Sequence, residues 1–438
     1  MMRSAWLLHF VAIGCASASL AAADEPARRA PTDEAPRRAP AEARPSSTGR
    51  VFGAAREIVT LGWLSDEPGS ARGNQEAVGR RLESSGAQIE RETDEWGDDF
   101  LVVTWTEGNR GLEDLAALAG LRWLDLSRTN ITDAALDTVG QLTKLQVLKL
   151  QQTRVTDQGL AQLSRLTRLE GLALHDTKTS AAGLRHLAPL QNLRILNLSW
   201  TQTGDDGLAV VAGFPRLEEL YLFDAKVTDA GVSQLARLTN LGALKLTNND
   251  ITSSGAVALA QLPNLEALWL DFTQVDDSCL GQLALLPKLR GLHVAETQVT
   301  DAGLAKLARC RTLALLDLAN LPITDAGLRH LERCPGLGML SLEGTHITPA
   351  AGATLARMPL LTQVSVANTA IDDSVVAALA RSGRLTHVNL SGTAVSDGAL
   401  RHFDHCPHLV ELNVRGTKIS DQALAGLRRA LPAVKVIR

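Results

Sequence analysis

The chain has 438 residues, of which 45% are hydrophobic and only 3% aromatic, and its formal net charge is −4. A core made almost wholly of Leu, Ala, Val and Ile suits thin repeated layers better than one bulky globular centre. The slight negative charge, with no basic stripe inside the repeated part of the chain, argues against nucleic acid as a partner.

Residues 1–23 have the features of a secretory signal peptide: a basic start at Arg3, an apolar stretch from Trp6 to Ile13 and small residues ending at Ala23. The apolar run is shorter than the roughly 18 residues that span a bilayer. We therefore expect cleavage after Ala23 and an exported protein that is periplasmic, displayed on the cell surface or secreted.

A lipoprotein signal is an alternative interpretation of the same segment. Residues 12–15, Ala-Ile-Gly-Cys, resemble the lipobox at which bacterial lipoproteins are cut and acylated on the cysteine. Lipidation at Cys15 thus stays open beside simple cleavage. A lipid anchor of this kind is the one membrane attachment that we expect.

Two segments precede the regular part of the chain. Residues 24–50 are rich in Pro, Ala and Arg and cannot bury apolar area, which predicts a disordered linker. Residues 51–111 are predicted to form an N-terminal cap. Within this cap we expect a helix over Asn74–Ser84, followed by a hairpin made of Gln88–Arg91 and Phe100–Trp105 that turns near Gly97.

A repeat of constant length occupies residues 112–438. Thirteen leucines open thirteen full units at intervals of 24 residues with no insertion. These are Leu121, Leu145, Leu169, Leu193, Leu217, Leu241, Leu265, Leu289, Leu313, Leu337, Leu361, Leu385 and Leu409. An incomplete unit precedes them in Leu112–Gly120, and a last helix over Gln422–Ala430 with a cap strand over Val434–Ile437 follows. Each opening leucine is position 1 of its repeat below.

Each repeat divides into a short strand and a short helix. Apolar side chains at positions 1, 4 and 6 point inward, while the residues between them face the other side of the pleat. A Thr-Asp-x-Gly-Leu phrase, as in residues 300–304, supplies an acceptor for a helix N-terminus, and leucines three apart then bury one helix face. The predicted fold is a right-handed α/β solenoid with a parallel sheet on its concave face and helices on its convex face.

Position 9 holds a threonine in ten repeats, and its hydroxyl is expected to satisfy backbone groups in the bend after the strand. The ten are Thr129, Thr153, Thr177, Thr201, Thr273, Thr297, Thr345, Thr369, Thr393 and Thr417. Ala225, Asn249 and Leu321 interrupt the series, which predicts local irregularity in those turns.

The pattern LxxLxLxxTxI/VTDxGLxxL resembles the cysteine-containing subclass of leucine-rich repeats, and the secreted bacterial proteins that carry them. Three of the five cysteines, Cys310, Cys334 and Cys406, occupy the subclass position three residues before the opening leucine, whereas other residues fill it elsewhere. The resemblance implies a horseshoe scaffold that binds partners. Cys310 and Cys334 are near enough for a disulfide, but stacked side chains run parallel, so we expect free thiols.

Solenoids of this type usually bind on the concave sheet, which positions 5, 7 and 8 line. Repeats four to seven place an unusual share of the scarce aromatic residues there, beside acidic ones. The predicted ligand-binding residues are Trp200, Tyr221, Phe223, Asp224, Lys245, Trp269, Asp271, Phe272, His293 and Glu296. Such a patch suits a protein, a peptide or a glycan. A purely structural role, in which the aromatic rings seal strand edges, is the competing interpretation.

Enzymatic activity is not expected. No phosphate loop, Gly-x-Ser-x-Gly elbow or His-Glu-x-x-His helix is present, and neither catalytic residues, metal ligands nor a cofactor are predicted. His175 and His293 lie five repeats apart, about 24 Å at the strand spacing, and cannot share a metal ion. The prediction is an extracytoplasmic, monomeric interaction scaffold. A glycan-binding module and an F-box-like substrate adaptor are the alternatives, and the export signal argues against the adaptor.

Overall fold

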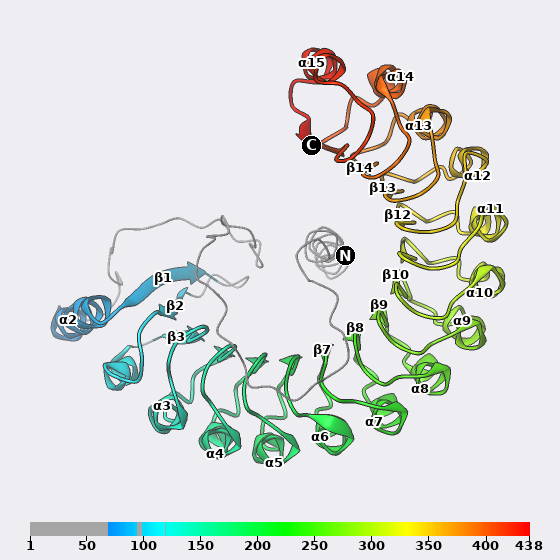
Figure 1. Ribbon diagram of the computed structural model, residues 1–438. Helices are drawn as coiled ribbons and strands as arrows, with labels where there is room; N and C mark the ends of the chain where they lie inside the picture. The colour runs from blue at the N-terminus through cyan, green and yellow to red at the C-terminus, as the bar shows by residue number, and fades with distance from the viewer. Residues whose placement is uncertain (1–68, 94–98, 119) are drawn as a thin grey trace, which may run out of the picture.

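The computed structural model describes residues 69–93, 99–118 and 120–438, so the predicted signal segment, linker and beginning of the cap lie outside the described residues. The described chain winds into an open horseshoe whose inner side is lined by strands and whose outer side carries the helices (Figure 1). A single sheet of 16 strands, arranged in chain order, runs through it. The predicted α/β solenoid is confirmed.

The sheet is antiparallel only between β1 (Ala87–Thr93) and β2 (Asp99–Trp105) and parallel from β2 onward. Each repeat strand pairs with the next in register, so that residues 24 apart lie opposite one another. The strands are β3 (Leu121–Asp125), β4 (Val147–Lys149), β5 (Gly171–Ala173), β6 (Ile195–Asn197), β7 (Glu219–Tyr221), β8 (Ala243–Lys245), β9 (Ala267–Trp269), β10 (Gly291–His293), β11 (Leu315–Asp317), β12 (Met339–Ser341), β13 (Gln363–Ser365), β14 (His387–Asn389), β15 (Glu411–Asn413) and β16 (Lys435–Ile437).

The convex side carries one short α-helix in each repeat. These helices are α3 (Asp133–Val139), α4 (Asp157–Leu160), α5 (Ala181–Leu184), α6 (Gly204–Val211), α7 (Asp229–Gln234), α8 (Ser253–Ala258), α9 (Asp277–Leu283), α10 (Asp301–Leu307), α11 (Asp325–Leu328), α12 (Ala351–Leu355), α13 (Asp373–Ala380), α14 (Asp397–Leu400) and α15 (Asp421–Ala430). Several continue as 3₁₀ turns: η2 (Ala161–Arg165), η3 (Arg185–Leu187), η4 (Leu235–Arg237), η5 (Leu259–Gln261), η6 (Arg329–Arg333) and η7 (Arg401–His405). Many α-helices are thus shorter than the two turns expected from the leucine spacing.

The core follows the leucine pattern. All thirteen position 1 leucines are at most 4% exposed, as the 24-residue period requires. One continuous apolar cluster runs from Val78 in the cap to Val434 near the last strand. Because each layer is covered only by its neighbours, burial of each leucine depends on the repeats on both sides.

The first layer is covered by the expected helix and hairpin. The helix α2 (Gly69–Ser84) begins earlier than predicted, and β1 and β2 extend the predicted hairpin strands by one to three residues. Trp105, at the end of β2, is 1% exposed, and its indole N–H donates to the carbonyl of Gly108 at 3.0 Å. A 3₁₀ helix, η1 (Leu112–Ala117), occupies the helical half of the incomplete unit.

Position 9 threonines each close their own turn. The hydroxyl of Thr273, for example, donates to the carbonyl of Leu270 at 2.6 Å. The predicted role of these hydroxyls is therefore confirmed, with the bond formed inside each repeat. The same geometry recurs in the other nine repeats that carry this threonine.

The turn at Ala225 is irregular, as its missing hydroxyl predicts, because the following residue Lys226 also has a positive φ of 60°. Asn249 of the next repeat supplies hydrogen bonds to this turn. The Asn249 amide nitrogen donates to the carbonyls of Leu222 and Leu246 at 2.6 and 2.9 Å. Its amide oxygen accepts from the backbone N–H groups of Ala225 and Val227, both at 3.1 Å. One buried amide thus serves two adjacent turns.

Position 8 adopts a left-handed backbone in every repeat. Its φ angle lies between 48° and 68° in all thirteen units, although only three of them have glycine there. The residues are Arg128, Gln152, Asp176, Trp200, Asp224, Asn248, Phe272, Glu296, Asn320, Gly344, Asn368, Gly392 and Gly416. The repeat geometry imposes this conformation because the chain must turn sharply from the strand toward the convex side.

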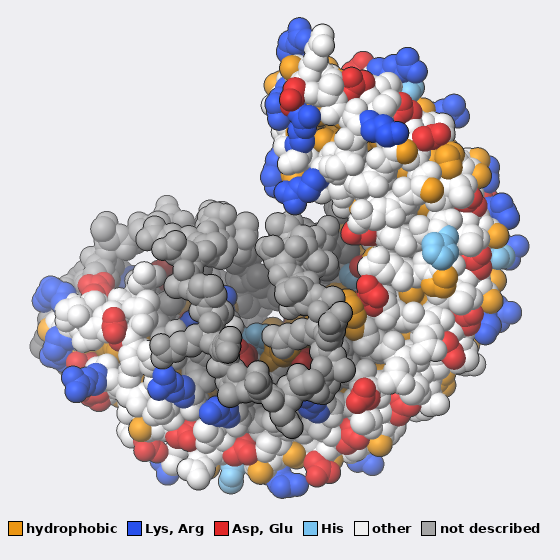
Figure 2. All heavy atoms as spheres, in the orientation of Figure 1, with side chains coloured by type: hydrophobic (Ala, Val, Ile, Leu, Met, Phe, Trp, Pro, Cys, Tyr) orange, Lys and Arg blue, Asp and Glu red, His pale blue; other side chains and the backbone are white. Residues whose placement is uncertain are grey.

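Acidic and basic side chains alternate along the outer rim, and basic ones gather around the C-terminal end near α15 (Figure 2). Arg428, Arg429 and Arg438 are exposed at that end, as expected for a terminal layer. Of the helices in the described ranges, none combines the length and apolarity needed to cross a membrane. The four cysteines of the described chain are buried free thiols, in agreement with the prediction for Cys310 and Cys334.

Candidate functional site

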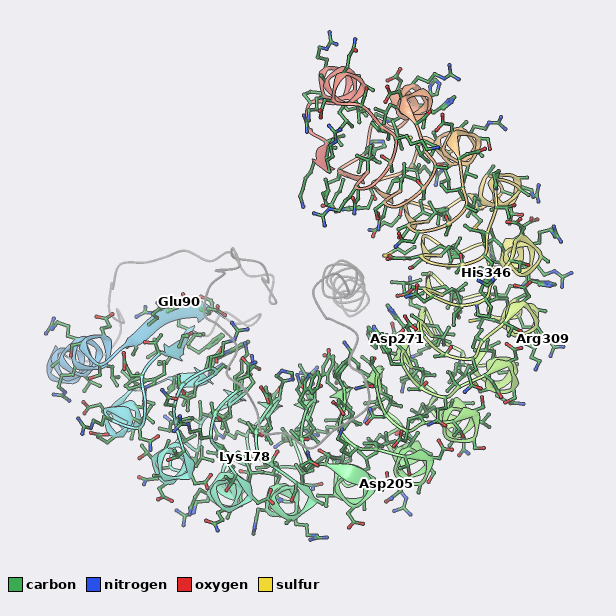
Figure 3. All side chains as sticks on the ribbon, in the orientation of Figure 1. Glu90, Lys178, Asp205, Asp271, Arg309 and His346 are labelled. Atoms are coloured by element: carbon green, nitrogen blue, oxygen red, sulfur yellow. The ribbon has the colours of Figure 1, made fainter. Side chains whose placement is uncertain are left out.

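The candidate surface lies on the concave side of repeats four to nine, at and just beyond the carboxyl ends of the strands. Position 5 side chains form one row across the sheet, in which Tyr221, Lys245, Trp269, His293 and Asp317 are successive neighbours. Asp271, at position 7, points from the strand side into the horseshoe, whereas Arg309 points outward beside the helices (Figure 3). The register therefore unites residues that are 24 apart in sequence.

Two of the predicted aromatic residues are exposed. Trp200 is 42% and Phe272 is 55% exposed, and both occupy the left-handed position 8. The Trp200 ring packs against Phe223 with the ring centroids 4.8 Å apart. Both rings therefore expose apolar area that is not buried in the core of the fold.

The remaining predicted aromatic residues are more enclosed. Trp269 is only 9% exposed and stacks on His293 with the centroids 5.2 Å apart. It packs with Ala243, Ala267 and Leu315, which all occupy position 3 and form a small apolar cluster with it on the concave side. Trp269 and His293 therefore build the floor of the surface and present little area of their own, which the sequence did not reveal.

Tyr221 forms a local polar pair beneath the patch. Its hydroxyl donates to the carboxylate of Glu219 at 2.7 Å. Burial raises the pKa of Glu219, although the hydrogen bond from Tyr221 partly offsets this. Burial likewise raises the pKa of Tyr221, with the neighbouring carboxylate adding to the effect, so Tyr221 stays a neutral donor. The Tyr221 hydroxyl hydrogen is therefore already engaged within the protein.

Three charged residues of the predicted site lie beside the aromatic rings or at position 8. The Lys245 ammonium lies 5.5 Å from the centroid of the Phe223 ring, and burial lowers the pKa of Lys245 despite the nearby Asp271 carboxylate. Asp224 pairs with Lys226. Glu296 is exposed and accepts from the Asn320 amide at 2.7 Å.

Asp271 is the most enclosed acid of the predicted set. Its carboxylate accepts from the backbone N–H of Ala295 at 3.0 Å and from the Thr247 hydroxyl at 3.4 Å. Burial raises the pKa of Asp271, and the Asp317 carboxylate adds to the rise while His293 opposes it. Asp271 thus belongs to a coupled group with His293 and Asp317.

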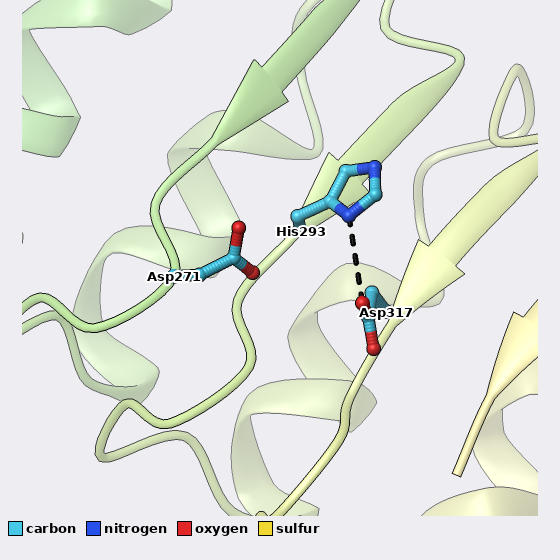
Figure 4. Close-up of side chains that lie close together, drawn as sticks. All are labelled: Asp271, His293 and Asp317. Atoms are coloured by element: carbon cyan, nitrogen blue, oxygen red, sulfur yellow. Dashed lines mark ion pairs between the residues drawn. The ribbon is translucent and has the colours of Figure 1, made fainter. Parts of the chain in front are cut away.

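Asp317 was missed by the sequence reasoning. Its Oδ2 lies 3.5 Å from Nδ1 of His293, and its side chain is 14% exposed (Figure 4). Burial alone would raise the pKa of Asp317, but its hydrogen-bonding and charge interactions with His293 leave that pKa below its ordinary value. Asp317 occupies position 5 one repeat beyond His293, where the same row of the sheet continues.

Sequence comparison identifies the repeat. The family model described as a leucine-rich repeat region matches residues 100–367, which is more than half of the chain, and a leucine-rich repeat model matches residues 405–427. This chain belongs to the leucine-rich repeat proteins. No curated protein matches it.

Solved leucine-rich repeat structures share the fold. An internalin from Listeria monocytogenes matches with a TM-score of 0.55 and 21% identity, over 85% of this chain and 98% of that protein. A leucine-rich repeat protein from Leptospira interrogans matches with a TM-score of 0.53 and 19% identity, over 74% of this chain and 80% of the other. At these identities the likeness shows a common leucine-rich repeat fold and nothing about the concave surface.

Proposed function

We propose that this protein is a binding scaffold that holds an extended segment of a partner protein against the concave face, between Trp200 and Phe272. The observation that carries the proposal is the exposure of two large rings at position 8, where the backbone is left-handed. A side chain with a Cβ costs roughly 1–2 kcal/mol in that conformation. Folding gains little from an exposed ring, so a role outside the fold accounts for it.

The spacing of the two rings suggests the length of the bound segment. Phe272 lies three repeats beyond Trp200, about 14 Å at the strand spacing of about 4.8 Å. An extended chain covers that distance in about four residues. A segment with apolar side chains near each end would therefore contact both rings at once.

The charges between and beside the rings suggest the polarity of the partner. Asp224 and Asn248 occupy position 8 between the two rings, and the exposed Asp176 and Glu296 flank them. Acidic side chains beside aromatic anchors favour a partner segment with a basic residue between its apolar ones. A glycan would instead use the two rings as separate stacking platforms.

The test is photo-crosslinking on the full-length protein in its native cells. A benzophenone amino acid at position 272 should trap a protein partner, identified by mass spectrometry, whereas the same group at position 368 should not. Asn368 is the matched control because it also occupies position 8 with a left-handed backbone. Equal adducts at both positions, or none at 272, would refute the proposed surface, and adducts lost after glycosidase treatment would identify a glycan ligand instead.

We also propose that the protein acts outside the cytoplasm. The support is the basic start, apolar stretch and small residues of segment 1–23. Mass spectrometry of the mature N-terminus tests this: an end at Asp24 supports cleavage after Ala23, an acylated Cys15 supports a lipoprotein, and an intact Met1 in the cytoplasm contradicts export.

The finer assignment to the cysteine-containing subclass is likewise a proposal. Its support is the burial of Cys310, Cys334 and Cys406 at the subclass position. The Cys310 thiol lies 3.8 Å from the Leu289 carbonyl and the Cys406 thiol 3.7 Å from the Ala380 carbonyl. If the thiols have this structural role, alkylating reagents should modify them only after unfolding.

A further inference from the structure

Three side chains from consecutive repeats converge at the floor of the concave surface. Asp271 follows β9, His293 ends β10 and Asp317 ends β11 (Figure 4). Each offers one nitrogen or oxygen atom, and these three atoms all lie within 4.8 Å of one another. The parallel register creates this cluster because residues 22 and 24 apart in sequence meet on neighbouring strands.

The cluster is buried and contains two carboxylates. His293 is 2% exposed, and its Nδ1 is the ring nitrogen that faces the carboxylate of Asp317 (Figure 4). Buried charged groups are normally paired with an opposite charge or bound to a metal ion. Two carboxylates, Asp271 and Asp317, share the site, and Lys245 is a cation close enough to interact with Asp271. A further cation would balance the site.

The spacing matches a small divalent ion. Zinc binds imidazole nitrogen and carboxylate oxygen at about 2.0–2.2 Å, so two ligands of a zinc tetrahedron lie about 3.4 Å apart. The observed separation of His293 Nδ1 and Asp317 Oδ2 is 3.5 Å. The Asp271 carboxylate offers the third ligand atom, within 4.8 Å of the other two, and its bond to the Ala295 N–H would orient it.

We propose that Asp271, His293 and Asp317 form a binding site for a divalent transition-metal ion of the zinc class. The mixed nitrogen and oxygen ligands favour such an ion over calcium or magnesium, which take oxygen ligands and higher coordination numbers. Three protein ligands leave one coordination position for water or for a group of a bound partner. The site is independent of the proposed partner segment, because none of its ligands is Trp200 or Phe272.

The test is calorimetric titration of the full-length protein, freed of metal by chelation, with zinc chloride and separately with calcium chloride. The wild-type chain should bind one zinc ion that Asp317→Asn and Asp271→Asn each weaken by about 100-fold or more, since even outer-shell substitutions cost 10–100-fold. Asp125→Asn should leave binding unchanged. Asp125 is the matched control because it also ends its strand at position 5, beside Lys149 at 3.5 Å.

Surface histidines are controlled separately. His402 and His405 lie three residues apart in η7, so the titrations are repeated in a His402→Ala/His405→Ala background. Zinc should also raise the unfolding midpoint of the wild-type chain and not that of Asp317→Asn. Absence of binding in the wild-type chain, or equal zinc affinity in wild type and Asp317→Asn, overturns the proposal. If Asp317→Asn fails to fold by circular dichroism, Asp271→Asn and His293→Gln decide by the same criteria.

Discussion

The carboxylate of Asp277 accepts two hydrogen bonds from Thr300, one from the backbone N–H at 2.7 Å and one from the hydroxyl at 2.6 Å. Asp277 begins α9 and Thr300 caps α10, so this pair joins consecutive repeats. The pattern recurs at Asp133–Thr156, Asp157–Ser180, Asp205–Thr228, Asp229–Thr252, Asp301–Thr324, Asp325–Thr348, Asp373–Ser396 and Asp397–Ser420. The Thr-Asp phrase thus stabilises the stack as well as each helix.

Substitution of Asp277 should loosen this stack. Asp277→Ala leaves the Thr300 N–H without its acceptor, and we expect a loss of about 2 kcal/mol in unfolding free energy. Urea denaturation followed by circular dichroism measures it. Asp250→Ala is the control, because the Asp250 side chain is exposed and its backbone bonds are unaffected, and it should change stability by less than about 0.5 kcal/mol. Equal effects of the two substitutions would show that the inter-repeat bonds contribute nothing.

Because Asn249 bonds to the turn at Ala225, substitutions at these two positions should have strongly non-additive effects on the unfolding free energy. Asn249→Thr restores a hydroxyl to its own turn but leaves the N–H groups of Ala225 and Val227 unpaired, at a cost of about 2 kcal/mol or more. Ala225→Thr added to Asn249→Thr supplies the missing hydroxyl to the Leu222 carbonyl and should recover part of the loss. A double-mutant cycle in urea measures the coupling, and strictly additive effects would contradict it.

The strained position of Phe272 predicts opposite changes in stability and binding. Phe272→Asn should stabilise the fold by about 1 kcal/mol, because asparagine tolerates the left-handed conformation and the lost ring is 55% exposed. The same substitution should lower the yield of partner adduct from a benzophenone placed at position 224. Trp200→Ala should also weaken partner binding far more than Asn389→Ala in repeat twelve. A Phe272→Asn variant that binds normally would remove the ring from the proposed surface.

The cap of α9 predicts an acid-sensitive component of stability. Hydrogen bonds from Ser278 and Ser253 to the Asp276 carboxylate lower its pKa to about 2. A lowered carboxyl pKa stabilises the folded state above the ordinary value near 4, and this contribution is lost as the pH falls from about 4 to about 2. Thermal unfolding should therefore show Asp276→Asn less stable than wild type at pH 6, with the difference shrinking toward pH 2.5. A difference that is constant with pH would contradict the assignment.

Much of the candidate site could be read from the period alone. The 24-residue interval places Trp200 and Phe272 on the same row, and the row is found where expected. The exposed fraction of each side chain could not be predicted from the 24-residue period. Trp269 and Phe272 differ by three residues, yet Trp269 packs over position 3 alanines while Phe272 projects from the turn.

The repeat length, the inward leucines, the helix caps and the direction of each strand side chain follow from the amino-acid pattern, because they depend on local periods of two and 3.6 residues. The pattern does not predict which side chains meet between repeats. The Thr300–Asp277 bonds, the Asn249 repair of a neighbouring turn and the convergence of Asp271, His293 and Asp317 all depend on register and on the curvature of the stack. Those quantities arise from packing of whole layers against one another, which no single 24-residue unit contains.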